Sequence, residues 1–274
     1  MTLPGHTPAV AAAPVNTRPD RPRTAWKGWL VLVVVAGITY LAGRAVGFSV
    51  SAVINNWHNG VRNLLPLTQP EYSFFPKTLP ALAETLEMAV IATAVSAALG
   101  LPIAFLASRA TNPSHPLLLA VRGVMNVIRA VPDILSAAIL VSIVGVGALS
   151  GAMALVLFDL AIIVKLVSEA LDAVDLGAHE AALAAGATWT TAARSGVLSE
   201  ILPAYASQVL YTLELNVRAS TVIGLVGAGG LGVLIDQERT FYRYHAVGMI
   251  ILEILVVVVV IEALSSWLRG RLTR

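Results

Sequence analysis

Opposite charges stand four residues apart at two places inside apolar stretches of the sequence: Glu214 precedes Arg218, and Arg129 precedes Asp133. In a helix this spacing brings both members to one face, where they can neutralise each other. A charge near the middle of a membrane-spanning helix costs about 2.5–3.5 kcal/mol, so it needs a partner or a water-filled cavity. The pairs therefore fit two uses, a structural ion pair or an Arg that offers guanidinium donors to an anionic solute. Both uses stay open, and the neighbouring carboxylate would keep any anion site weak.

Three polar residues lie close to the first pair: Asn216, Ser220 and Thr221. They could line a wet path through a membrane, or they could hydrogen-bond between neighbouring helices. Interhelical hydrogen bonding is the favoured interpretation.

Other ionisable residues in apolar stretches fall into two groups. Lys165 and Glu169 stand four residues apart and are predicted to form a structural pair. Glu84, Glu87 and Glu253 have no partner close in sequence. A proton relay is one hypothesis for these three carboxylates, and an interhelical contact or exposure to a cavity is the preferred one.

A glycine run looks at first like a nucleotide-binding loop, because Gly227, Gly229 and Gly232 fit the pattern G-x-G-x-x-G. That loop needs a strand before it and a helix after it, whereas here an apolar helical segment precedes the run. We therefore expect Gly227, Gly229, Gly230 and Gly232 to allow close packing between helices or to form a flexible mouth.

The sequence lacks the motifs of the common catalytic sites. It has no G-x-x-x-x-G-K-[ST] motif, its only lysines are Lys27, Lys77 and Lys165, and it contains no cysteine. The five histidines are scattered without metal-ligand spacing. We predict no catalytic residue, no metal site and no cofactor.

The composition indicates whether this chain lies in water or in lipid. Of its 274 residues, 57% are hydrophobic and 12% are charged, and the mean hydropathy is +0.80. Soluble proteins carry about 25% charged residues, so there is too little charge here to coat a water-facing surface. The formal net charge is +2, without a basic stripe interleaved with aromatics, which argues against nucleic acid as a partner. The chain is predicted to lie in a lipid bilayer.

A helix needs about 20 apolar residues to cross a bilayer, and six segments meet this length. They are residues 26–48, 78–108, 116–146, 151–171, 196–224 and 244–268. Pro132 should kink the third segment, and Pro102 the second.

Basic residues in short loops favour the cytoplasmic side. With six spans, one side collects both termini, the loop after the second span and the segment before the fifth. Its basic residues are Arg18, Arg21, Arg23, Lys27, Arg109, Arg122, Arg194, Arg269, Arg271 and Arg274. We therefore expect both termini in the cytoplasm.

The expected organisation has four parts. Residues 1–25 form a disordered cytoplasmic tail, and residues 26–77 hold the first span with an outer loop. Residues 78–268 form the core, and residues 269–274 form a cytoplasmic C-terminal tail. Within the outer loop, the apolar spacing over residues 49–64 fits either an interfacial helix or an ordinary loop.

The stretch from Ser168 to Trp189 does not fit a membrane. It carries Glu169, Asp172, Asp175 and Glu180 with no basic residue before Arg194, although a cytoplasmic loop is usually basic. Leu176 or Gly177 is expected to close one helix, and residues 178–185 to form a short Ala-rich helix that Gly186 terminates. A short exposed helix is marginal alone, so this one is expected to pack into a groove on another protein.

This stretch carries a resemblance to a known family. The residues Glu180, Ala181 and Ala182, then Gly186 after three residues, and farther on Leu202 and Pro203, resemble the cytoplasmic coupling motif of ABC importer permeases. In that motif a short helix sits in a cleft of an ATPase subunit. A second Leu-Pro usually stands four residues upstream, where this sequence has Leu198-Ser199, and the departure puts a local kink there in doubt.

A second stretch sharpens the resemblance. The run Leu213 to Gly232 and the segment Arg129 to Asp133 closely resemble the permease subunit of phosphonate importers. The similarity covers roughly residues 78–268. The glycine-rich end is also similar to methionine importer permeases, so residues 214–220 are the more discriminating piece.

The resemblance implies an all-α, polytopic permease fold of about six transmembrane helices with a cytoplasmic coupling helix, in the bacterial inner membrane. It implies a second permease copy in a homodimer, two ATP-binding cassette ATPase subunits that hydrolyse the ATP, and an external solute-binding protein. The expected function is import of phosphonate or a related small phosphorus oxyanion. The alternatives are a permease for phosphite, phosphate, methionine or another solute, a proton-coupled secondary transporter, and a membrane scaffold that transports nothing.

Overall fold

The computed structural model describes residues 25–175 and 177–272. The expectations for residues 1–24, for Leu176 and for residues 273–274 fall outside these ranges. The chain divides into two compact units, one up to Asn59 and one from Gly60 onward, which are described separately. Within the described residues every regular element is helical.

The first unit holds α1 (Ala25–Ala45) and most of α2 (Val50–Leu64). Residues 26–45 of α1 are long and apolar enough to cross a membrane, and none of them is buried within the chain. The choice left open for residues 49–64 is resolved in favour of a helix. Its large apolar side chains, such as Ile54 and Trp57, are exposed.

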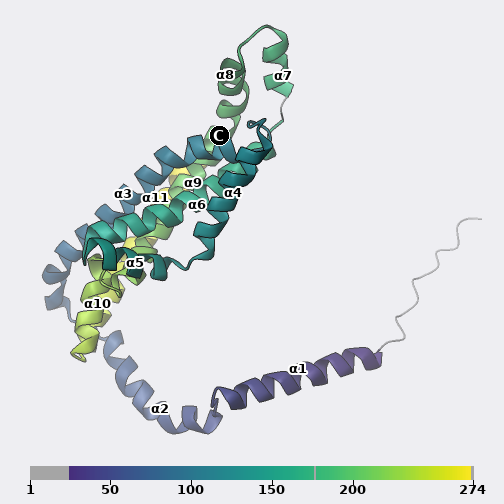
Figure 1. Ribbon diagram of the computed structural model, residues 1–274. Coiled ribbons are helices and arrows are strands. Elements are labelled where there is room, and N and C mark those ends of the chain that lie inside the picture. The colour runs from purple at the N-terminus through teal and green to yellow at the C-terminus, as the bar shows by residue number, and fades with distance from the viewer. Residues whose placement is uncertain (1–24, 176, 273–274) are drawn as a thin grey trace, which may run out of the picture. The chain divides into compact units, whose positions relative to one another are not determined.

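The second unit is a helical bundle (Figure 1). Its elements in chain order are η1 (Leu65–Thr68), η2 (Tyr72–Phe74), α3 (Phe75–Ala107), α4 (His115–Ala130), α5 (Asp133–Val144), α6 (Ala148–Asp172), α7 (Gly177–Ala184), α8 (Trp189–Ala192), the π-helical η3 (Ala193–Leu198), α9 (Ser199–Gly224), α10 (Gly230–Thr240) and α11 (Tyr244–Leu272).

The two ends of the bundle are built differently. At the glycine end α3 and α6 begin, and α9 passes through the run Gly227–Gly232 into α10. At the hairpin end α3 and α6 finish, and α7 and α8 project as a helical hairpin (Figure 1). The end of α11 also lies at the hairpin end, because Arg269 pairs with Glu214 and Arg271 lines a groove with Ala97.

Four helical stretches in the described residues are long and apolar enough to cross a membrane, and the bent pair α4 and α5 makes a fifth if it counts as one span. The four are residues 26–45, 72–107, 148–172 and 244–271. α9 has 26 residues but also carries charges at Glu200, Glu214 and Arg218. It nevertheless runs beside α3 and α6 from the hairpin end to the glycine end (Figure 1). Helices therefore occur at all six predicted segments, the third of which is divided into α4 and α5.

Small side chains let α3 and α6 pack closely along their length. The buried positions of α3 include Ala89, Ala92, Ser96, Gly100 and Ala104. At Gly100 an added Cβ would lie 2.6 Å from a methyl carbon of Ile163, so a side chain there would force Ile163 to shift. Helices in lipid associate through such small residues, because hydrocarbon supplies no hydrophobic drive between them.

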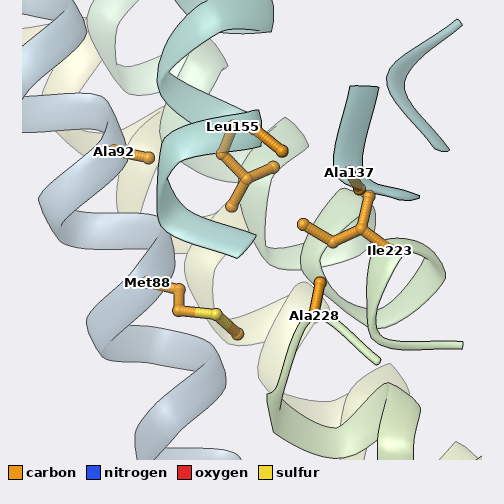
Figure 2. Close-up of a cluster of buried hydrophobic side chains, with 7 residues drawn as sticks. Met88, Ala92, Ala137, Leu155, Ile223 and Ala228 are labelled. Carbon is orange, nitrogen blue, oxygen red and sulfur yellow. The ribbon is translucent and has the colours of Figure 1, made fainter. Parts of the chain in front are cut away.

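Larger side chains fill the space between α3, α6 and α9. Met88, Leu155 and Ile223 are buried together, and Ala137 of α5 and Ala228 join them (Figure 2). A second cluster at the hairpin end joins Ala104 of α3, Ile163 and Leu171 of α6, Val197 of η3 and Ile201 of α9.

The third predicted span is broken rather than kinked. α4 ends at Ala130, α5 begins at Asp133, and the two helices are bent by 89°. Val131 is extended, as expected for a residue before proline, and Pro132 has no N–H to continue the helix. The bend expected at Pro132 is therefore present, but residues 116–146 form two helices instead of the one kinked helix that was predicted.

The glycine run makes a tight crossing at the glycine end. Gly227, Gly229 and Gly230 all have positive φ, where a side chain would be strained. The backbone carbonyl of Gly227 accepts a hydrogen bond from Gly147 N at 3.0 Å, and Leu231 N donates to Thr85 Oγ1 at 2.9 Å. The run thus ties the end of α9 to the starts of α6 and α3.

We predict that Gly232→Ala destabilises the bundle by about 1–3 kcal/mol through overpacking. Its new Cβ would clash with Thr221 O and lie 2.7 Å from Gly224 Cα, and backbone atoms cannot rotate away. The control is Gly123→Ala in α4, where nothing lies within 4 Å and a gain of about 0.5–1 kcal/mol is expected. Thermal unfolding in detergent measures both, and equal melting temperatures for the two variants would contradict the packing argument.

Candidate functional site

The hairpin of α7 and α8 has a well-defined turn. Gly186 has a φ of +88°, its N–H donates to Leu183 O at 2.9 Å, and Ala187 N donates to Ala182 O at 3.0 Å. This is the Schellman arrangement that ends helices at glycine. At the other end of α7, Asp175 Oδ1 accepts a hydrogen bond from Gly177 N at 2.9 Å. The short helix therefore begins and ends on its own local contacts.

One face of α7 is exposed and the other packs on η3. Glu180 and Ala181 are exposed, whereas His179 is buried. At Gly196 of η3 an added Cβ would lie 2.9 Å from His179 N, so a side chain there would push α7 away. Sequence reasoning missed Gly196, and a glycine inside a predicted helix was the available signal. Glu180 therefore lies on the solvent-exposed face of α7.

The helix before α7 ends earlier than predicted. The sequence placed its end at Leu176 or Gly177, but α6 ends at Asp172, and Ala173 N turns back to Ala170 O. Val174 N likewise bonds to Leu171 O, so the backbone turns out of the α-helix here, and the Asp172 carboxylate accepts hydrogen bonds from Ser108 Oγ and Arg109 N in the loop after α3. Leu202 and Pro203 lie in the first turns of α9, and Leu202 is 51% exposed. Where the usual upstream Leu-Pro is missing, the chain forms the π-helical η3 instead.

The charge pair in α9 forms as the spacing indicated. Arg218 pairs with Glu214, and Glu214 also lies 3.7 Å from Arg269 Nη2 of α11. The Glu214 side chain is 10% exposed and that of Arg218 is 47% exposed. Lys165 and Glu169 in α6 pair in the same way, with both side chains well exposed.

The other predicted pair does not exist as a helical pair. The break at residues 131–132 puts Arg129 at the end of α4 and Asp133 at the start of α5. In the described ranges no salt bridge between them occurs, and Asp133 Oδ1 accepts from Ile134 N at 2.9 Å. The spacing argument failed because it assumed a continuous helix. Arg129 is exposed.

A buried polar cluster joins α3, α6 and α9 in the middle of the bundle. Asn216 Nδ2 donates to Thr93 Oγ1 at 2.9 Å and to Asp159 Oδ2 at 2.5 Å. Asp159 and Asn216 are fully buried, and each keeps one side-chain oxygen without a hydrogen-bond partner among the described residues. The sequence analysis named Asn216 but missed Asp159, whose signal was a lone acid in an apolar helix.

The remaining polar residues of the prediction take local roles or stay buried. Ser220 Oγ and Thr221 Oγ1 both donate to Val217 O of their own helix. Glu253 in α11 is buried, with neither carboxylate oxygen bonded within the described part of the chain. Residues 25–175 and 177–272 bring together no group of His, Asp and Glu that could hold a metal ion.

A protein family matches most of this architecture. Residues 100–274 match the binding-protein-dependent transport system inner membrane component family. The chain belongs to this family. It is therefore a permease of the ABC importer class, all-helical and multi-pass in the inner membrane.

Two relatives and one solved structure are similar to the permease. Phosphite transport system permease protein PtxC of Stutzerimonas stutzeri is 35% identical over 89% of each chain. Phosphate-import permease protein PhnE of Mycolicibacterium smegmatis is 36% identical over 70% of this chain, which spans only 36% of that protein's length. A chain of the MetNI methionine ABC transporter in an inward-facing conformation superposes with a TM-score of 0.67 at 25% identity, covering 74% of the permease and all of that chain.

We predict that Arg218→Ala costs the permease about 1–3 kcal/mol, because the nearly buried Glu214 carboxylate loses its closest partner. The matched control is Lys165→Ala, which breaks another pair at the same spacing between exposed side chains. That loss is expected to cost about 0–1 kcal/mol. Thermal unfolding of both variants in nanodiscs measures the difference. An equal loss of stability in both would show that the burial of Glu214 does not strengthen its pair with Arg218.

Proposed function

We propose that this permease forms the membrane path of an ATP-driven importer for phosphonate or a related small phosphorus oxyanion. Two copies would pair, each gripped at α7 by an ATPase subunit, and an external binding protein would deliver the solute. The permease itself would be non-catalytic. The observation that carries the proposal is the exposed, acidic, self-capped α7 on a chain of the importer permease family.

The orientation follows from where the basic residues lie. The hairpin end carries Arg109, Arg122, Arg194, Arg269 and Arg271, and the glycine end carries Lys77, Arg239 and Arg243. The excess at the hairpin end supports a cytoplasmic location for α7 and for the C-terminus. With the first span added, the N-terminus would lie on the same side.

The solute class rests on the relatives. Their names specify phosphite and phosphate, and both are phosphorus oxyanions. The structural neighbour is named for methionine, which makes methionine the second candidate. A path with few free cations suits an oxyanion that must leave as readily as it enters. Arg218, half exposed and already paired with Glu214, would offer such a weak contact.

ATP-driven closure of the two ATPases would draw the two α7 helices together. Because α7 packs on η3 and η3 continues into α9, this movement would tilt α9 and change which end of the path is open. The solute's affinity would reside mainly in the binding protein. The switch is a shift between two populations of the same bundle.

Reconstitution in nanodiscs with the partner ATPase and binding protein tests the solute class. We expect ATPase activity to rise with phosphonate, phosphite or phosphate in the panel and not with methionine. Stimulation by methionine alone would reassign the solute. Uptake that survives loss of the ATPase and collapses with the proton gradient would replace the proposal with secondary transport, for which Glu253 would be the carboxylate to examine.

We predict that Glu180→Lys and Gly186→Val uncouple ATP hydrolysis from uptake. The first reverses the charge of the exposed face of α7, and the second forces a side chain into a positive φ and distorts the turn. Solute uptake per ATP should fall about fivefold or more, while the amount of permease in the membrane stays constant. Glu169→Gln, an exposed acid on α6, is the control and should leave uptake unchanged. Normal uptake in both α7 variants would exclude α7 as the coupling element.

A further inference from the structure

One carboxylate at the hairpin end joins α6 to two other segments of the permease, the loop after α3 and α4. Asp172, the last residue of α6, accepts hydrogen bonds at Oδ1 from Ser108 Oγ at 2.6 Å and from Arg109 N at 2.7 Å. Its Oδ2 accepts from Arg122 Nη2 of α4 at 2.6 Å. Both carboxylate oxygens are therefore used, by partners that are 50 to 64 residues away in sequence.

Arg122 also binds a backbone carbonyl at the end of α3. Its Nε donates to Ala107 O at 2.6 Å, the last residue of α3, while its Nη2 holds Asp172. Ala107 O would otherwise lack a partner, since the last carbonyls of a helix have none within it. One guanidinium thus joins the ends of α3 and α6 to α4. We call Asp172, Arg122 and Ser108 the carboxylate clasp.

The clasp sits at the base of α7. Only residues 173–176 separate Asp172 from the first residue of α7, and Val174 in this link packs against the buried cluster of Leu171, Val197 and Ile201. The other arm of the hairpin, α8, continues through η3 into α9 without a gap between the helical elements. A force on α7 therefore meets two connections, one through η3 to α9 and one through the clasp to α3 and α4.

The geometry differs from that of an ordinary surface ion pair. Surface pairs contribute about 0–1 kcal/mol, because both side chains move freely in water. Here the Asp172 and Arg122 side chains are 25% and 28% exposed, and each makes further bonds to neighbouring backbone. Such charge-assisted bonds with several donors fix orientation as well as distance.

We propose that Asp172 is a positioning residue that transmits movement of α7 to α3 and α4. This inference rests on the proposed function only in that α7 is the element an ATPase grips. With the clasp intact, α3, α4 and α6 move with the base of α7 as one body. With the clasp open, α7 moves with α9 alone, and the bent pair α4 and α5 stays behind.

The test measures movement directly and needs no solute. Because the chain has no cysteine, spin labels can be placed on Ala184→Cys in α7 and Val127→Cys in α4, both at exposed positions. In nanodiscs we expect a narrow distance distribution for the wild type, and a broader one for Asp172→Asn and Ser108→Ala. Glu169→Gln, one turn earlier on α6, is the control and should keep the narrow distribution.

Coupling is the second readout, on the complex with the ATPase. Asp172→Asn should lower uptake per ATP about fivefold or more, while ATP hydrolysis and complex assembly are retained. Arg122→Lys keeps the charge but loses the planar donors that reach Ala107 O and Asp172 together. Its uptake per ATP should therefore lie between that of the wild type and that of Asp172→Asn. A merely structural role would reduce assembly and melting temperature instead of the ratio of uptake to hydrolysis.

Two results overturn the inference. One is an unchanged α7–α4 distance distribution in Asp172→Asn, and the other is unchanged uptake per ATP in that variant. The proposed function would fail separately, through a wild type that shows no ATP-dependent uptake at all. In that case the distance distributions still decide whether the clasp joins α7 to α4.

Discussion

Polar groups inside a bilayer are costly unless they find partners, and this constraint shapes the helical bundle of the permease. Backbone groups meet it through the hydrogen bonds of the helices. Among the side chains, Asn216 bonds to Thr93 and Asp159 and so fixes α9 against α3 and α6, whereas Arg218 and Glu214 pair within α9. At the hairpin end, Asp172 joins Ser108 and Arg122. Apolar packing in lipid specifies less, because side chains lose little by facing hydrocarbon instead.

The two ends of the bundle are joined by different kinds of contact. At the glycine end, Gly147 N donates to Gly227 O, Leu231 N donates to Thr85 Oγ1, and glycines let the backbones of α9 and α10 lie close together. At the hairpin end, long side chains and a π-helical segment make the connections. π-helical segments often occur at functional sites. The carboxylate clasp lies at the same end and holds the ends of α3 and α6 to α4.

The sequence predicted the helices, the α7 segment and the Glu214–Arg218 pair, because each depends on local composition or spacing. It predicted a kink at Pro132 but not the 89° bend, since the angle depends on what α5 packs against. The Arg129–Asp133 pair failed for the same reason. Asp159 and the roles of Asp172, Arg122 and Gly196 depend on partners 15 to 64 residues away, where spacing carries no information. A single acid in an apolar helix was the signal for Asp159.

The polar residues of α9 differ in how deeply they are buried. Asn216 is fully buried and directed at α3 and α6, so it holds helices together and cannot meet a solute in this arrangement. Arg218, two residues later and on another face, is half exposed while its carboxylate partner is buried. An anion that reached Arg218 would compete with Glu214, which remains beside it. That competition keeps the contact weak, and a weak contact lets a solute pass through a path that must not retain it.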